Sequence, residues 1–151
     1  MPSEMPNGTS VSVQGRTSAA ERVFKRILAG LKANGFSTED IFAVHLGLEE
    51  AFINAVRHGN KSNPNKKVNI TFDIKPDKAE ICLQDQGEGF NPDSIPDPTS
   101  PDNIFKIGGR GLFLIRSYMD ATNFNDKGNR ICMVKYNSKT HENSSKKRAS
   151  K

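Results

Sequence analysis

The most informative part of the sequence is the glycine-rich segment Asp85-Gln86-Gly87-Glu88-Gly89-Phe90. It is preceded by an acid and an amide four residues apart, Glu50 and Asn54. It is followed by a second glycine-rich stretch, Gly108-Gly109-Arg110-Gly111-Leu112. Each motif alone is a weak signal. In this order, with a helix, a strand end, a loop and a second helix beneath them, they indicate a nucleotide-binding site in one small domain.

The apolar periodicity predicts the elements that carry these motifs. Helical spacing predicts helices over residues 18–34, 37–58 and 111–120. Alternation of apolar and polar residues predicts strands over residues 9–14, 68–74, 79–84, 122–125 and 131–136. Residues 90–107 contain four Pro, which is typical of a functional loop such as a lid.

Composition favours a single domain. The chain has 151 residues, of which 34% are hydrophobic and 26% charged. We expect one domain over residues 9–137, with disordered tails over residues 1–8 and 138–151. No apolar run approaches the roughly 18–20 residues of a membrane span, and no signal-peptide pattern is present, so we expect a cytoplasmic protein without a membrane partner.

The cysteines and the net charge exclude some site classes. Cys82 and Cys132 lie in apolar strands, so we expect two buried thiols rather than a disulfide, and no zinc spacing appears. The net charge is +5, but Ser138–Lys151 carries +4 of it, which leaves +1 for the rest. We therefore expect no direct nucleic-acid contact. The alternative, binding through the basic tail, would be lost on deletion of the tail.

The second predicted helix has an unusual polar face. On a helical wheel of about 100° per residue, Glu50 and Asn54 lie together, opposite the apolar stripe. Glu49 points away from Asn54, so Glu50 is the acid that we select. An Asn oxygen suits Mg²⁺, which takes few protein ligands, and a nearby Glu can accept a proton from an attacking hydroxyl. The alternative is an ordinary solvated helix face.

Asp85 follows an apolar strand, so its carboxylate is expected to emerge at the strand end. An ionised Asp only accepts hydrogen bonds, and the adenine amino group is a suitable donor. Gly87 and Gly89 permit positive φ angles and a close approach of a ligand to the main chain. The alternative is an ordinary turn.

The second glycine stretch precedes an apolar helix. Unpaired N–H groups at a helix N-terminus attract phosphate, and we expect Gly108, Gly109 and Gly111 to provide this site. Arg110, together with Lys106 from the loop, can add contacts to the outer phosphates. A hinge or a simple N-terminal turn is the alternative.

Together the motifs resemble the ATP-binding domain of the GHKL superfamily. The segment Leu48–Ala55, followed by Arg57-His58-Gly59, is similar to its asparagine box. Residues 85–90 resemble its first glycine box, and Gly109-Arg110-Gly111-Leu112 its second. The small size favours the branch of anti-sigma-factor serine/threonine kinases of the RsbW and SpoIIAB type, and the resemblance covers about residues 9–136.

This resemblance implies a Bergerat fold, an α/β (α+β) two-layer sandwich with helices on one face of a mixed, mainly antiparallel sheet. It implies ATP and Mg²⁺ as cofactors, Glu50 as general base, Asn54 as Mg²⁺ ligand, Asp85 as adenine reader and residues 90–107 as ATP lid. Arg57, His58 and Leu112 enter the predicted nucleotide site as members of the boxes.

The resemblance also implies partners. Such proteins phosphorylate a serine of a STAS-type antagonist, bind a sigma factor or similar regulator, and are usually homodimers. A sequestering module of the same fold that does not transfer phosphate is the main alternative. A histidine kinase is disfavoured because this chain has no room for a phosphoacceptor helix pair. One departure is Asn129, after Gly128, where the family commonly has Thr near the adenine.

Overall fold

The computed structural model describes residues 8–88 and 109–140. Residues 1–7 of the predicted tail over residues 1–8, the predicted lid over residues 90–107, and residues 141–151 lie outside the described part. The described elements follow the predicted order closely, and they are β1 (Thr9–Gln14), α1 (Thr17–Ala33), α2 (Thr38–Asn54), the π-helical turn η1 (Ala55–Gly59), β2 (Lys67–Ile74), β3 (Lys78–Gln84), α3 (Gly109–Tyr118), β4 (Ala121–Phe124) and β5 (Arg130–Tyr136).

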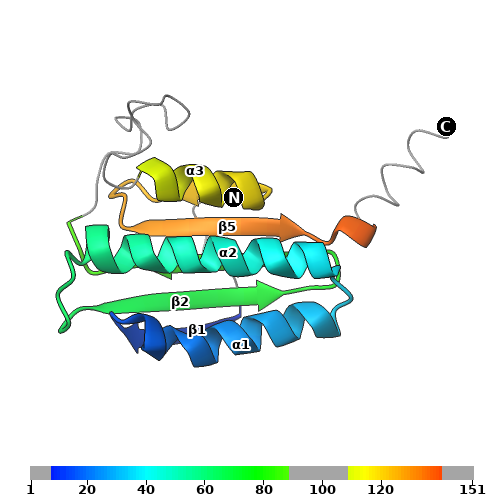
Figure 1. The fold of residues 1–151 in the computed structure, drawn as a ribbon, viewed down its shortest axis with the longest axis horizontal. Helices are drawn as coiled ribbons and strands as arrows, with labels where there is room; N and C mark the ends of the chain where they lie inside the picture. Colours follow the sequence, from blue (N-terminus) through cyan, green and yellow to red (C-terminus); the bar gives the residue numbers. More distant parts are fainter. Residues whose placement is uncertain (1–7, 89–108, 141–151) are drawn as a thin grey trace.

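The strands form one five-stranded sheet in the order β1-β2-β3-β5-β4. All four pairings between these strands are antiparallel. The helices α1, α2 and α3 cover one face of the sheet, so the molecule has two layers (Figure 1). The predicted two-layer sandwich is confirmed. The pairing of β3 with β5 brings the end of β3 beside the start of β5, and this is where the predicted site begins.

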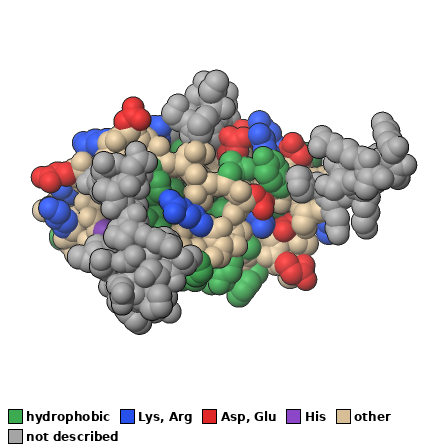
Figure 2. Space-filling view, turned by 90° about the horizontal axis from the view of Figure 1, so that it is seen from above, with side chains coloured by type: hydrophobic (Ala, Val, Ile, Leu, Met, Phe, Trp, Pro, Cys, Tyr) green, Lys and Arg blue, Asp and Glu red, His purple; other side chains and the backbone are tan. Residues whose placement is uncertain are grey.

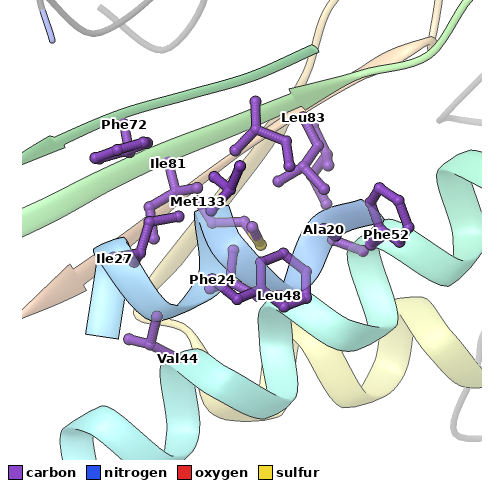
Figure 3. Packing of buried hydrophobic residues seen from close by; sticks show 14 of the residues in the cluster. Ala20, Phe24, Ile27, Val44, Leu48, Phe52, Phe72, Ile81, Leu83 and Met133 are labelled. Atoms are coloured by element: carbon purple, nitrogen blue, oxygen red, sulfur yellow. The ribbon is translucent and has the colours of Figure 1, made fainter. Parts of the chain in front are cut away.

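The core lies between these two layers. Alternate residues of the strands point toward the helices and are buried, among them Ile70 and Ile81. They meet the apolar stripes of α1 and α2 (Figure 3). The rings of Phe24 and Phe52 join the two helices edge to face, with centroids 5.9 Å apart. This packing fixes α2, which carries the predicted acid and amide. None of the helices in the described part is long and apolar enough to cross a membrane.

The turns between these elements have local causes in the sequence. Gly35 ends α1 with a φ of +78°, a conformation that only glycine adopts readily. Ser37 then caps α2, because its Oγ accepts a hydrogen bond from the main-chain N–H of Asp40 at 3.0 Å. Gly128 takes the second such conformation, with a φ of +79°, in the turn before β5.

The cysteine prediction was wrong. Cys82 of β3 and Cys132 of β5 face each other in register, and their sulfur atoms form a disulfide. The two residues lie 50 positions apart in the sequence. Both strand assignments were correct, but neither strand indicates by itself that the other is its neighbour. The disulfide is therefore a consequence of the strand order.

The described chain continues three residues past the domain end that we expected at residue 137. Asn137 is buried, and its Nδ2 donates to the main-chain oxygens of Pro76, at 2.9 Å, and Asn34, at 3.3 Å. Ser138 donates to the Asp40 carboxylate from both its N–H, at 2.9 Å, and its hydroxyl, at 2.7 Å. These contacts fasten the end of β5 to the start of α2.

Candidate nucleotide site

The site begins where α2 changes from α-helix to π-helix. The α-helix ends at Asn54, and the wider turn η1 follows over Ala55–Gly59. The N–H of Asn60 closes this turn by donating to the oxygen of Ala55 at 2.8 Å. Such π-helical turns are rare in proteins overall, and those that occur often lie at functional sites. Here the turn sets the position of Gly59 and Asn60 relative to the end of β3.

Asn54 has a buried amide nitrogen that lacks a hydrogen-bond partner within the described residues. A buried donor without a partner costs about 1–3 kcal/mol, so an amide in this state calls for an additional partner. The amide lies against Gly111 of α3, where a Cβ atom would stand 2.7 Å from Nδ2. The structure thus brings the asparagine of the first motif to the glycines of the third.

The two neighbouring acids of α2 differ in the way that the helical wheel predicts. Glu49 is exposed and forms an ion pair with His45 at 3.0 Å on the outer side of the helix. Glu50 is half-buried, one turn before Asn54 on the same side of the helix. The described residues include no group of three or more His, Cys, Asp or Glu side chains that could hold a metal ion. A Mg²⁺ ion here would therefore rely on the Asn54 oxygen and on phosphate oxygens, which fits its preference for few protein ligands.

Asp85 follows β3 directly, as predicted, and is held beside the π-helical turn. Its Oδ1 accepts a hydrogen bond from the N–H of Gly87 at 2.8 Å. Its carboxylate lies so close to Gly59 that a Cβ atom at position 59 would overlap it. Burial raises the pKa of Asp85, an effect that the Gly87 N–H and the charges of Lys127 and Lys66 partly oppose. A donor from a ligand would favour the ionised form of this partly buried carboxylate.

Glycine is needed in this loop for a different reason than the one we expected. Gly87 does not adopt a positive φ; within the described residues, only Gly35 and Gly128 among the glycines do so. A Cβ atom at position 87 would instead overlap the main-chain oxygen of Gly59. The two glycines allow the π-helical turn and the loop after β3 to touch. Gly89 lies outside the described residues.

The third motif starts α3 rather than preceding it. The helix begins at Gly109, so Gly109, Arg110 and Gly111 form its first turn, where main-chain N–H groups have no partner within the helix. Leu112 is buried in the core, so only its main-chain N–H could reach a ligand. Lys106 and Gly108 lie outside the described residues, and the roles of these residues and of the Arg110 side chain stay predictions.

Arg57 and His58 belong to the π-helical turn, and both side chains are exposed. Partial desolvation lowers the pKa of His58, and the positive charge of Arg57 lowers it further. Their predicted contact with nucleotide rests on the resemblance to the asparagine box.

The sequence analysis did not assign a site role to Asn60 or to Gly59, which it quoted only as part of the asparagine box, and the structure places both against the loop around Asp85. Asn60 is buried, with 1% of its surface exposed, and its Oδ1 accepts from the N–H of Gln86 at 2.7 Å. Gly-Asn after a helix reads as a helix stop, and this local signal concealed their contacts with the loop around Asp85.

These residues meet at one end of the two-layer sandwich, where α2 ends, β3 ends and α3 begins (Figure 1). An unpaired amide, a carboxylate and a helix N-terminus at one place match the three parts predicted for a nucleotide site. Comparison with protein families gives a match to the histidine kinase-like ATPase domain over residues 13–135. The chain belongs to the histidine kinase-like ATPase family.

Curated relatives within this family agree with the branch that the motifs predicted. The chain is 38% identical over 109 residues to the serine-protein kinase RsbW of Oceanobacillus iheyensis, covering 68% of this chain and 69% of that protein. It is 36% identical over 110 residues to the RsbW of Staphylococcus epidermidis, with the same coverage. The resemblance to RsbW-type kinases is confirmed, and so is the enzyme class at the level of this family.

A solved structure shows the same fold. The crystal structure of the RsbU and RsbW domains of a Mycobacterium tuberculosis protein matches 85% of this chain with a TM-score of 0.51 and 14% sequence identity. The match covers 32% of that longer chain, so it concerns the architecture of one domain.

Proposed function

We propose that this chain is an ATP-dependent protein kinase of the anti-sigma-factor type. It transfers the γ-phosphate of ATP to a serine of a STAS-type antagonist, and it sequesters a sigma factor or a similar regulator, acting as a homodimer in the cytoplasm, where ATP is available. The observation that supports the nucleotide part most directly is the buried amide nitrogen of Asn54, which lies against the first turn of α3 and has no hydrogen-bond partner among the described residues. The RsbW relatives support the kinase part.

In this proposal each residue has a separate task. Asp85 accepts a hydrogen bond from the adenine amino group, and the first turn of α3 offers N–H groups to the phosphates. Asn54 holds Mg²⁺, which neutralises charge on the transferred phosphoryl group. Glu50 takes the proton of the serine hydroxyl as its oxygen bonds to the γ-phosphorus, the bond to the bridging oxygen breaks, and ADP leaves.

The mixed charges on the face shown in Figure 2 suit a protein partner better than nucleic acid. On the face shown in Figure 2, described Lys and Arg side chains are interspersed with Asp and Glu side chains. A nucleic-acid site commonly needs a continuous basic surface. The proposal therefore assigns protein partners to this chain.

The test combines a binding titration with a transfer assay. The purified protein is titrated with ATP and Mg²⁺, and is also incubated with ATP labelled on the γ-phosphate and STAS-type proteins of its own organism. Label on a STAS serine that Glu50→Gln abolishes is the expected result. ATP binding without transfer would favour the sequestering module, and no ATP binding would refute the nucleotide site.

A further inference from the structure

The environment of Asp85 contains two buried asparagines whose contacts point to one role. Asn60 joins three segments: its Nδ2 donates to the oxygen of Lys67 at 3.1 Å, and its Oδ1 accepts from the N–H of Gln86 at 2.7 Å. The Gln86 side chain returns to the same place, because its Oε1 accepts from the N–H of Lys67 at 2.6 Å. Asn60 thus ties the π-helical turn and the start of β2 to the residue directly after Asp85.

Asn129 holds the same aspartate from the side of β5, and 7% of its surface is exposed. Its main-chain oxygen accepts from the N–H of Asp85 at 2.9 Å, and its Nδ2 donates to the oxygen of Asp85 at 3.3 Å. Its Oδ1 accepts from Nδ2 of Asn125 at 2.7 Å. Both ends of the Asn129 amide therefore have a partner within the protein, and one of these partners is the main chain of Asp85.

We propose that Asn60 and Asn129 are positioning residues that fix the Asp85 carboxylate for recognition of an adenine amino group. This inference rests on the proposed nucleotide site. Asn129 holds Asp85 itself and Asn60 holds the residue after it, so the main chain is fixed on both sides. The carboxylate is oriented by a hydrogen bond from the N–H of Gly87 to Oδ1. The second oxygen, Oδ2, lies beside Gly59, where no Cβ atom intervenes. A fixed carboxylate distinguishes an amino group from a carbonyl at the same place on a base.

The chain provides a matched control at the other end of the sheet. Asn137 is as buried as Asn60, with 2% exposed, and it also bonds main-chain groups, those of Asn34, Pro76 and Lys139. Its loss should lower stability as the loss of Asn60 or Asn129 does, but it has no contact with Asp85. Any effect that Asn137→Ala shares with the other two variants is therefore structural.

The experiment compares affinities for ATP and for inosine triphosphate, which has a carbonyl in place of the adenine amino group. We expect the unmodified protein to prefer ATP. In Asn60→Ala and Asn129→Ala, affinity for ATP should fall about tenfold while that for inosine triphosphate changes little, so that the preference is largely lost. Asn137→Ala should unfold at a lower temperature and keep the preference.

Two results separate failure of this proposal from failure of the proposed function. If the unmodified protein binds neither nucleotide, the proposed nucleotide site is refuted. If it prefers ATP and the folded Asn60→Ala and Asn129→Ala variants keep that preference, the positioning role is refuted. Should those variants not fold, Asn129→Asp replaces them, because it keeps the size of the side chain and the oxygen that accepts from Asn125 but loses the Nδ2 donor to Asp85; an unchanged preference in that folded variant refutes the role of Asn129.

Discussion

The main chain of Gly111 lies against the side-chain amide of Asn54, although the two residues belong to different helices. A Cβ atom at position 111 would stand 2.7 Å from Nδ2 and 2.8 Å from Oδ1 of Asn54. The glycine therefore leaves the space that the asparagine occupies. One residue of the predicted phosphate motif and one residue of the predicted metal motif thus depend on each other directly.

Gly111→Ala should damage the site while leaving the domain folded. The added methyl group must displace the Asn54 amide, which is the end of a movable side chain, so the affinity for Mg·ATP should fall about tenfold or more. Helical structure should persist, since alanine favours a helix over glycine by about 1 kcal/mol. Calorimetric titration and thermal unfolding measure the two effects. Ser117→Ala, an exposed change in the same helix, is the control, and equal ATP affinities of the two variants would contradict this prediction.

Glu50→Gln should reduce phosphoryl transfer by about a hundredfold or more while the ATP affinity stays within about twofold, because only the proton acceptor is removed. The neighbouring Glu49→Gln provides the control. That change breaks only the exposed pair with His45 and should leave kcat unchanged. Steady-state kinetics with the unphosphorylated partner protein as acceptor measures both. A larger loss for Glu49→Gln would mean that the two acids were assigned in the wrong order.

Asp85→Asn should stabilise the ligand-free protein and abolish the preference for adenine. Burial raises the pKa of Asp85 above its ordinary value of 3.8, so the folded chain binds this proton more tightly than the unfolded chain does. The free energy of unfolding therefore decreases as pH rises from 3.8 through the raised pKa. The Asp85→Asn variant has no such decrease in the free energy of unfolding, because asparagine does not ionise, and its oxygen still accepts from the Gly87 N–H. Urea unfolding between pH 4 and 8 tests the prediction, and a variant less stable than the unmodified protein at pH 7 would contradict it.

Asp40 should contribute stability with the opposite dependence on pH. Burial favours its neutral form, but hydrogen bonds from the N–H and hydroxyl of Ser138 and from Ser37 outweigh this effect and lower the pKa. Its contribution is therefore present above the ordinary pKa of 3.8 and is lost as pH falls through the lower folded pKa. Asp40→Asn should cost about 2 kcal/mol at pH 7, and the cost should shrink below pH 3.8. Urea unfolding at both pH values measures this difference, with the exposed Asp77→Asn as control.

The disulfide should stabilise the oxidised protein. Cys82 and Cys132 close a loop with a sequence separation of 50, which corresponds to about 4 kcal/mol in the chain-entropy account. Reduction should therefore lower the free energy of unfolding by about this amount. Urea unfolding with and without dithiothreitol measures the effect, and the Cys82→Ser, Cys132→Ser protein is the control that should not respond. An unmodified protein whose stability does not change with dithiothreitol would contradict the assignment.

Local patterns were sufficient for most of the elements. The alternation of Val68, Ile70 and Phe72 predicted β2, and Asn34-Gly35 with Ser37 predicted the break between the first two helices. These signals work because hydrogen bonding and burial within one helix or strand depend on neighbouring residues. The same reasoning placed the three motifs on a helix, at a strand end and at the start of a second helix, which are the elements that border the candidate site.

Contacts between distant segments were beyond local patterns. The pairing of β3 with β5 results from many small packing terms, so the bond between Cys82 and Cys132 could not be foreseen from either strand. Gly59 is required because it touches Asp85, and Gly87 because it touches Gly59. In both cases the reason for a glycine is a neighbour in space, whereas the sequence displays only a helix stop and a turn.

The contacts of Asn137 and Ser138 have a practical consequence for handling the protein. The described chain ends at Thr140, beside the start of α2, whereas the candidate site lies at the end of α2 (Figure 1). A fusion partner, affinity tag or surface linker attached directly after residue 140 would therefore begin at the end of the molecule away from the candidate site. Truncation before Asn137 would instead remove the fastening itself. An attachment point for binding measurements is best placed after residue 140 rather than before Asn137.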